Sequence, residues 1–370
     1  MEDQSRKIFT LTIHDLARGG AGVAREESGR AVFIPFTAPG DRVRVEIIEE
    51  KKNYAQARLL EVLEPSPMRQ KPPCSVFGQC GGCQWQHLPY DFQWKTKVTG
   101  LRHALKRAGI ETDAWDERPA EQIWEYRNRV QMRGEGGTLG FYEEGTHLIV
   151  PVERCEISRP EINEALPALK VEAAKLKNAY KLEIEVMPDG EVIHAWNSRH
   201  AAFGFRQVHD AQNEKLKAWV GASILGRETL LDLYGGYGNL SLPLVDQMKV
   251  VHCVDFSSPT STPGGVSPKM HFHRSAVAPW LKKFELAKGA KHVSVILDPP
   301  REGLGGDFEE IACLLKKLKV SEIVAVGCDV DSWVRDVSRF VKNGWKLKKA
   351  AALDLFPQTA HVEAIAQLVL

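Results

Sequence analysis

The segment Asp232-Leu233-Tyr234-Gly235-Gly236-Tyr237-Gly238-Asn239 is the clearest indication of the fold in the C-terminal part of this 370-residue chain. It completes an apolar run, Thr229 to Leu233, that predicts a strand, and the residues from Leu240 onward predict a helix. A strand, a glycine loop and a helix in this order indicate a doubly wound α/β domain. The glycines do not fit G-x-G-x-x-G, which disfavours a nicotinamide enzyme.

Three further apolar runs predict strands of the same domain: Val250 to Val254, Val293 to Leu297 and Glu322 to Val326. In doubly wound sheets, ligands bind beyond the carboxyl ends of the strands. The residues that follow these runs are therefore the candidates for chemistry, and they are Asp255, Asp298 and Cys328.

Asp255 follows the second strand, where an acidic side chain can accept hydrogen bonds from ribose hydroxyls. Together with the glycine loop, this acid suits S-adenosylmethionine, although a solvated aspartate at a strand end is an equal interpretation. Asp298 precedes two prolines, which stiffen the loop and hold its carboxylate over the site. Arg301 stands where amino-methyltransferases often carry an aromatic residue, which argues against methylation of an exocyclic amine.

Cys328 at a strand terminus above a cofactor pocket is a candidate nucleophile. Cys253 and Cys313 lie inside apolar runs, which predicts buried core thiols. Glu363 begins the last apolar run, and its carboxylate is either a charge at the rim or a general base.

Cys74, Cys80 and Cys83 are separated by five and by two residues, and Gly81 and Gly82 let the backbone wrap their sulfurs. Three thiolates do not complete a four-coordinate site, and Cys155 is the best candidate for a fourth ligand.

Disulfides are disfavoured for these cysteines, because the chain opens without an apolar signal segment and cytosolic thiols stay reduced. Structural zinc remains open. Zinc sites usually group their closely spaced ligands two and two, so the grouping of three and one favours an iron-sulfur cluster.

The N-terminal residues 7–64 alternate in short strand-like runs broken by glycines, which predicts a small antiparallel barrel. A proline-rich linker at 66–73 follows, and a mixed region holds a predicted helix from Ala165 to Lys177 and a predicted strand from Tyr180 to Met187. We therefore predict three domains: a barrel at 1–66, a small α+β domain at 67–200 that carries the cysteines, and the α/β domain at 201–370.

The composition is that of a soluble globular protein, with 43% hydrophobic and 26% charged residues. No apolar run of about eighteen residues exists, so we expect no membrane span and a cytoplasmic location. The net charge of +1 neither demands nor excludes a nucleic-acid partner, and no obligate protein partner is evident.

One predicted helix begins near Trp94 and carries an uneven charge distribution. Its basic residues stand either on a solvated face or on a stripe that faces RNA, and they are Lys95, Lys97, Arg102, Lys106 and Arg107.

With these residues in hand, the chain resembles the RNA (uracil-5-)-methyltransferase family, and within it the iron-sulfur members that modify 23S ribosomal RNA. The resemblance covers nearly the whole chain. It implies an N-terminal TRAM domain, which is an oligonucleotide-binding-type barrel, a Rossmann-like methyltransferase domain, and an RNA substrate, with ribosomal RNA favoured and tRNA as the alternative.

The resemblance also implies roles for single residues. It makes Cys328 the nucleophile that bonds to uracil and Glu363 the base, and it assigns a 4Fe-4S cluster to Cys74, Cys80, Cys83 and Cys155. The residues that it assigns to S-adenosylmethionine are Gln207, Tyr234, Asn239, Asp255 and Asp298. The loop glycines Gly236 and Gly238, which let the backbone approach a ligand, complete the predicted cofactor site.

Two segments depart from the family pattern. The family usually follows its nucleophile with Asn-Pro, whereas Asp329 stands here, and we expect its negative charge to raise the pKa of the neighbouring thiol. Residues 257–268 replace the helical segment that we expect after the second strand. If these departures abolish turnover, the chain would be an RNA-binding protein of the same fold without catalysis.

Overall fold

The computed structural model describes residues 7–112, 114–198, 204, 206–260 and 265–370. By its contacts the chain divides into two compact units. The division into three domains at 1–66, 67–200 and 201–370 stays a prediction. None of the described helices has both the length and the apolar character that crossing a membrane requires. The first unit comprises Met1–Gly100, Gln122–His200 and Phe356–Ala360, and the second comprises Leu101–Glu121, Ala201–Leu355 and His361–Leu370.

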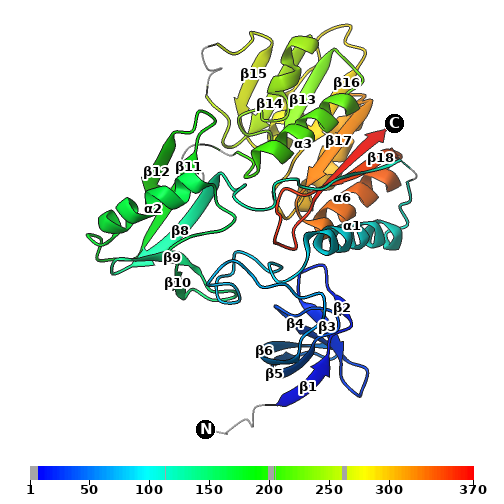
Figure 1. Cartoon of the computed structure of the whole chain (residues 1–370). Coiled ribbons are helices and arrows are strands. Elements are labelled where there is room, and N and C mark those ends of the chain that lie inside the picture. The colour runs from blue at the N-terminus through cyan, green and yellow to red at the C-terminus, as the bar shows by residue number, and fades with distance from the viewer. Residues whose placement is uncertain (1–6, 113, 199–203, 205, 261–264) are drawn as a thin grey trace. The chain divides into compact units, whose positions relative to one another are not determined.

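The N-terminal strands form a six-stranded sheet in the order β1-β5-β6-β4-β3-β2 (Figure 1). All its pairings are antiparallel except that of β4 with β6, which is parallel. The prediction of antiparallel pairing is therefore wrong for this pair, because the β5–β6 hairpin returns beside β4 in the same direction. The strands are β1 (Ile8–Thr12), β2 (Asp15–Leu16), β3 (Gly22–Arg25), β4 (Ala31–Ile34), β5 (Arg42–Glu50) and β6 (Tyr54–Glu64).

Alternating residues of these strands point into one apolar core, as their period of two predicts. Val32, Ile34, Val43 and Val45 are fully buried there, while the residues between them are at least partly exposed. The core that the sequence pattern predicts for the barrel is present.

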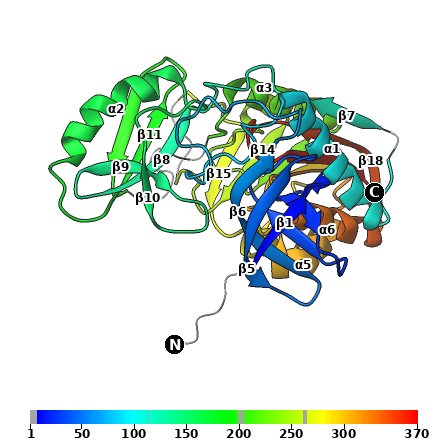
Figure 2. The ribbon, with the colours of Figure 1, turned by 60° about the horizontal axis from the view of Figure 1, so that its bottom comes forward.

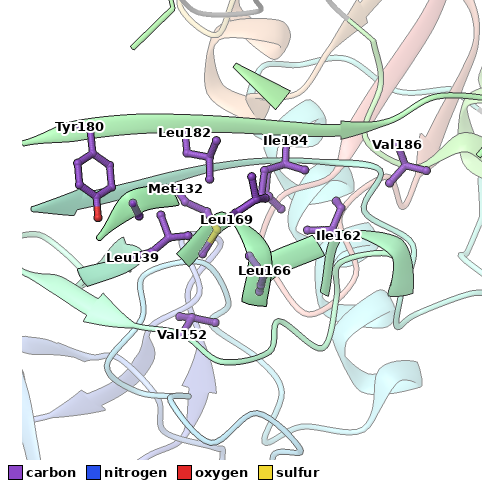
Figure 3. Packing of buried hydrophobic residues seen from close by; sticks show 12 residues of the cluster. Met132, Leu139, Val152, Ile162, Leu166, Leu169, Tyr180, Leu182, Ile184 and Val186 are labelled. Atoms are coloured by element: carbon purple, nitrogen blue, oxygen red, sulfur yellow. The ribbon is translucent and has the colours of Figure 1, made fainter. Parts of the chain in front are cut away.

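The second sheet of the first unit is antiparallel, in the order β10-β9-β8-β11-β12. The helix α2 covers one face of this sheet, and Figure 3 shows Ile162, Leu166 and Leu169 of the helix facing Leu182 and Ile184 of β11. The elements are β8 (Arg129–Glu135), β9 (Thr138–Tyr142), β10 (Ile149–Pro151), α2 (Pro160–Ala173), β11 (Tyr180–Val186) and β12 (Val192–Trp196).

The sequence pattern places α2 about five residues too late. The helix begins at Pro160, whose fixed φ and missing amide suit the first helical position. It ends at Ala173, ahead of the predicted Lys177. The predicted strand from Tyr180 is confirmed to within one residue.

The second unit is built on an eight-stranded sheet in the order β15-β14-β13-β16-β17-β19-β18-β7. All four predicted strands are present within one residue of their bounds, and β19 pairs antiparallel to its neighbours. Every residue of β13 and β16 is buried. The strands are β7 (Trp115–Arg118), β13 (Thr229–Leu233), β14 (Val250–Asp255), β15 (Met270–Arg274), β16 (Val293–Leu297), β17 (Glu322–Gly327), β18 (Lys346–Leu353) and β19 (Glu363–Val369).

Helices cover both faces of this sheet, and Figure 2 shows α3 on one face and α5 and α6 on the other. The predicted helix after Leu240 is instead a short 3-10 helix with Pro243 in its first turn. Between β14 and β15 the described residues contain no helix. Residues 261–264 of the segment 257–268 lie outside the described residues. The helical elements are α3 (Asp210–Ser223), η1 (Leu242–Gln247), α4 (Val277–Lys283), η2 (Gly305–Asp307), α5 (Phe308–Lys317) and α6 (Val330–Lys342).

The predicted helix near Trp94 is α1 (Tyr90–Arg107), which begins in the first unit and ends in the second. Four of its basic side chains are exposed, as expected for either interpretation of the stripe. Lys97 does not belong to that stripe. It is buried, and its Nζ donates to the carbonyl oxygen of Phe356 over 3.0 Å.

Candidate active site

The candidate residues of the second unit meet at one edge of the eight-stranded sheet. Tyr234, Asp298 and Cys328 each follow the carboxyl end of a parallel strand, and Asp255 is the last residue of another. Glu363 begins β19, which runs in the opposite direction, and Ala364 pairs with Gly327 at the end of β17. The antiparallel pairing therefore brings Glu363 beside Cys328.

The glycine loop takes the backbone conformations that its residues predict. Gly236 and Gly238 have φ values of 56° and 79°, and Tyr234 adopts φ 66° without being a glycine. A Cβ at Gly235 would stand 2.4 Å from the carboxyl carbon of Asp232, so only glycine fits there. Asn239, the last residue of the loop, exchanges two side-chain hydrogen bonds of 2.9 Å with Asn213 of α3.

The predicted ribose acceptor, Asp255, is half-buried at the end of β14. Its Oδ1 accepts two hydrogen bonds of 2.6 Å, from the backbone amide and from the hydroxyl of Ser257. Among the described residues no hydrogen bond reaches its Oδ2, which leaves that oxygen available to a ligand. Gln207, also predicted to bind the cofactor, is buried shortly before α3 begins.

Three carboxyl groups beneath the site influence one another. Burial first, and then the charges of Asp232 and Asp255, raise the pKa of Asp298 to about 7. Burial and the charge of Asp298 raise the pKa of Glu363 well above its ordinary value. The pKa of Asp298 therefore lies near neutral pH, and both carboxylates are stronger bases than ordinary acidic side chains, as general acid–base catalysis requires.

Asp232 is the third of these groups, and it was not among the residues for which the sequence pattern predicts a role. It is fully buried, and the hydroxyl of Ser241 donates to its Oδ2 over 2.5 Å. Burial and the charge of Asp255 raise its pKa to about 6. An ionisable residue inside an apolar strand is the signal that would have found it.

The thiol of Cys328 lies in an apolar pocket whose walls include Pro299, Leu304 and Trp333. Burial first, and then the charges of Glu363 and Asp298, raise its pKa to about 12, and the positive charge of Arg301 opposes this rise. Without a substrate, the sulfur is a protonated thiol at neutral pH.

The main causes of the raised pKa of Cys328 are burial and Glu363, and the effect expected of Asp329 stays a prediction. Asp329 is the N-cap of α6, and its Oδ1 accepts a hydrogen bond of 2.9 Å from the amide of Ser332. Its exposed carboxylate stabilises the start of the helix, and the rise in the pKa of Cys328 comes from burial and from Glu363.

The other two cysteines of this unit differ from each other. Cys253 is fully buried in β14, as predicted. Cys313 is exposed, which corrects the prediction of a core thiol. The buried face of α5 is formed by Phe308, Ile311, Ala312 and Leu315, and Cys313 stands on the opposite face.

The structure gathers the four cysteines of the first unit. Cys155 contributes to the raised pKa values of Cys74, Cys80 and Cys83, although burial is the largest cause in each case. The pKa of Cys80 rises to about 11 and that of Cys83 to about 12. The side chain of Asn163 holds the backbone of Cys155 through hydrogen bonds to its amide and its carbonyl oxygen.

Within the described ranges, no group of three or more His, Cys, Asp or Glu side chains is arranged to hold a metal ion. The geometry of the thiols therefore does not support the expected cluster, although the four residues lie near one another.

Comparison with known proteins gives three findings at the level of sequence. A sequence model of the TRAM domain matches residues 3–60. An uncharacterized RNA methyltransferase of Bdellovibrio bacteriovorus is 32% identical, over 97% of this chain and 94% of the relative. An uncharacterized RNA methyltransferase of Halalkalibacterium halodurans is 28% identical, over 98% of this chain and 97% of the relative.

Among solved structures, the fold is similar to that of the Pyrococcus abyssi tRNA (uracil-54, C5)-methyltransferase in complex with S-adenosyl-L-homocysteine. The TM-score is 0.74 at 22% identity, and the match covers 97% of this chain and 99% of the solved one.

Proposed function

Because this chain belongs to the RNA methyltransferase family, we propose that it methylates carbon 5 of a uridine in RNA, using Cys328 as a nucleophile that bonds to the uracil. S-adenosylmethionine is the methyl donor in this proposal. The TRAM domain at the N-terminus supports RNA as the substrate class.

One observation carries the proposal: Cys328 and Glu363 stand at neighbouring ends of β17 and β19. Ala364 pairs with Gly327, and the charge of Glu363 acts on the thiol. A nucleophile and a base side by side are what this reaction needs, because the same carbon pair of the uracil must first be attacked and then deprotonated.

Carbon 5 of uracil is a weak nucleophile, so the reaction begins at carbon 6. The thiol of Cys328 gives its proton to Asp298, whose pKa of about 7 leaves it half ionised at neutral pH. The thiolate then forms a bond to carbon 6, and the electrons of the carbon 5–carbon 6 double bond move into an enolate. When bound, S-adenosylmethionine would supply the methyl group for carbon 5, leaving as S-adenosylhomocysteine, and its positive charge would favour the thiolate of Cys328.

Glu363 completes the reaction. Its carboxylate removes the proton from carbon 5, the double bond re-forms, and the bond from carbon 6 to sulfur breaks. The thiolate of Cys328 then regains its proton from Asp298. The raised pKa of Glu363 makes its carboxylate a stronger base than that of an ordinary glutamate, and the proton that it takes from carbon 5 then passes to water.

The residues proposed to hold S-adenosylmethionine fit its chemistry. Oδ2 of Asp255 can accept hydrogen bonds from the ribose hydroxyls. Gly236 and Gly238 let the backbone approach the ligand, and the Asn239–Asn213 pair fixes the end of that loop. Tyr234 and Gln207 complete the proposed set together with Asp298.

The favoured RNA is 23S ribosomal RNA, on the resemblance to methyltransferases that modify it, and tRNA is the alternative. A 4Fe-4S cluster held by Cys74, Cys80, Cys83 and Cys155 belongs to the same proposal. What supports it is that the four cysteines lie near one another, since Cys155, Cys80 and Cys74 all act on the pKa of Cys83, after burial. No step of the reaction passes through the cluster.

The test is incubation of the protein, purified without air, with methyl-labelled S-adenosylmethionine and either unmodified ribosomal RNA or unmodified tRNA. Mass spectrometry of the nucleosides should detect labelled 5-methyluridine. The variant Glu363→Gln should slow the reaction by about 100- to 10,000-fold and accumulate RNA bonded to protein. A Cys328→Ala protein with full activity would refute the assigned roles.

Failure of both RNAs to become labelled would favour the other candidate, an RNA-binding protein without catalysis. Calorimetry with S-adenosylmethionine would then distinguish two causes. A protein that binds the cofactor but was given the wrong RNA shows heat of binding, whereas a protein without a cofactor site shows none.

A further inference from the structure

A groove in the second unit, distinct from the pocket of Cys328, lies between α3 and the strands β7 and β18. Its volume is about 470 Å³, within the range of sites that hold a small organic ligand. Its walls include Trp115, Arg118, Lys215, Trp219 and Lys349, with Asp116 as the acidic residue.

Two cations rest on tryptophan rings of this groove: Lys349 lines it, and Arg102 stands beside it on Trp115. Nζ of Lys349 lies 4.6 Å from the ring centre of Trp219, and the guanidinium of Arg102 lies 5.2 Å from that of Trp115. No carboxylate within the described ranges forms an ion pair with either cation. Their rings hold them in place without neutralising them.

The other two cations of the groove have carboxylate partners. Arg118 pairs with Asp116 over 2.8 Å, and Lys215 pairs with Glu121 over 3.1 Å. Lys349 differs from them, because burial lowers its pKa. The charge of Asp116 raises this pKa only in part, and Asp116 already pairs with Arg118. A bound anion would supply the missing negative charge.

The groove is close to the reacting edge of the same sheet. Ala350 lines the groove and pairs with Trp115, and Leu353 of the same strand pairs with Glu363. Three residues of a strand span about 10 Å. An RNA strand that occupies the groove can thus continue to the site of Cys328 and Glu363.

From these contacts we infer that the groove binds a single-stranded segment of the RNA substrate, with phosphates on Lys349 and Arg102 and a base against Trp115. Aromatic rings beside cations are the usual means of holding single-stranded nucleic acid. This inference extends the proposed function and rests on it for the identity of the anion.

The test measures binding of a labelled single-stranded RNA by fluorescence anisotropy at several salt concentrations, without S-adenosylmethionine. The double variant Arg102→Gln/Lys349→Gln should raise the Kd about tenfold and flatten the salt dependence by roughly 1.4, at about 0.7 for each phosphate that is no longer neutralised. Thermal unfolding of the variant checks that it is folded.

Lys316 provides a matched control, because its Nζ lies 5.4 Å from the ring centre of Trp345 and away from the groove. Lys316→Gln should leave the Kd and the salt dependence unchanged. Equal effects of the control and the double variant, or no effect of the double variant, would overturn the inference. If the double variant loses binding to a polyglutamate peptide but binds RNA as tightly as the parent protein, the groove binds a protein partner instead.

This readout does not depend on methyl transfer. If no 5-methyluridine forms but the double variant binds RNA more weakly than the parent protein, the proposed reaction is wrong and the proposed RNA-binding groove is supported. If the reaction is found and the double variant binds RNA as tightly as the parent, only the groove fails.

Discussion

The two cysteine sites of this protein differ in what raises the pKa of their sulfurs. Cys83 is surrounded by other thiols. Burial raises its pKa most, and the charges of Cys155, Cys80 and Cys74 raise it further. Cys328 is surrounded by carboxyls, chiefly Glu363 and Asp298, with Arg301 acting in the opposite sense. Both thiols have a pKa of about 12, for different reasons.

The difference teaches that a raised thiol pKa alone does not define a function. Several thiols that repel one another as anions can all be relieved by one cationic centre, which is a binding property. A single thiol beside carboxyls has proton acceptors at hand, which is a property of a reacting group. The following experiments separate the two sites on this basis.

The largest expected effect is that of Cys328→Ala, which should reduce methyl transfer by roughly 10,000-fold or more, because no other group can form the bond to carbon 6. Nucleoside mass spectrometry measures it. Cys313→Ala is the matched control, because Cys313 is exposed on α5 and far from the carboxyl cluster in sequence, and it should retain full activity. A similar loss in both variants would show that the assay reports thiol damage rather than catalysis.

The next effect concerns the other site. Loading the protein with iron and sulfide without air should give about four irons per chain if the four thiols hold a cubane cluster. Cys83→Ala should abolish this uptake, while Cys328→Ala should leave it unchanged. Metal analysis and the visible spectrum measure it. Stoichiometric zinc in the purified protein would contradict the cluster.

The third effect concerns the contribution of Asp298 to stability. Its pKa is raised from 3.8 to about 7, so ionisation of this group destabilises the fold as pH rises from about 4 to 7. Asp298→Asn should therefore raise the free energy of unfolding at pH 8 by roughly 2 to 4 kcal/mol, and by little at pH 4. Urea unfolding at both pH values measures it. Equal stabilisation at the two pH values would rule out ionisation as the cause.

The smallest effect sharpens the role of Asp329. Replacing it by Ala removes the N-cap of α6 and should lower the free energy of unfolding by about 1 kcal/mol. Asp329→Asn, which preserves the acceptor without the charge, should restore most of this. The thiol pKa of Cys328, measured from the pH dependence of alkylation, should remain within error in both variants. A clear fall in that pKa would return Asp329 to the role that its sequence position predicts.

Much of the fold could be predicted from local sequence pattern. The four apolar runs of the second unit are strands within a residue of their expected bounds, because a strand buried on both faces must be continuously apolar. The residues after them meet at one edge, because parallel strands share a direction. Helix bounds were less predictable, because α2 begins at Pro160, ahead of its apolar pattern, and the segment after Leu240 forms only a 3-10 helix.

The candidates for chemistry follow from the amino-acid sequence alone: the cysteine pattern, the glycine loop, and Asp255, Asp298, Cys328 and Glu363 at strand ends. How their charges combine depends on the folded chain. Register pairing brings Glu363 beside Cys328, burial couples Asp232 to Asp298, and capping directs Asp329 to α6. A pKa depends on burial and on neighbours distant in sequence, and only the folded chain brings these together.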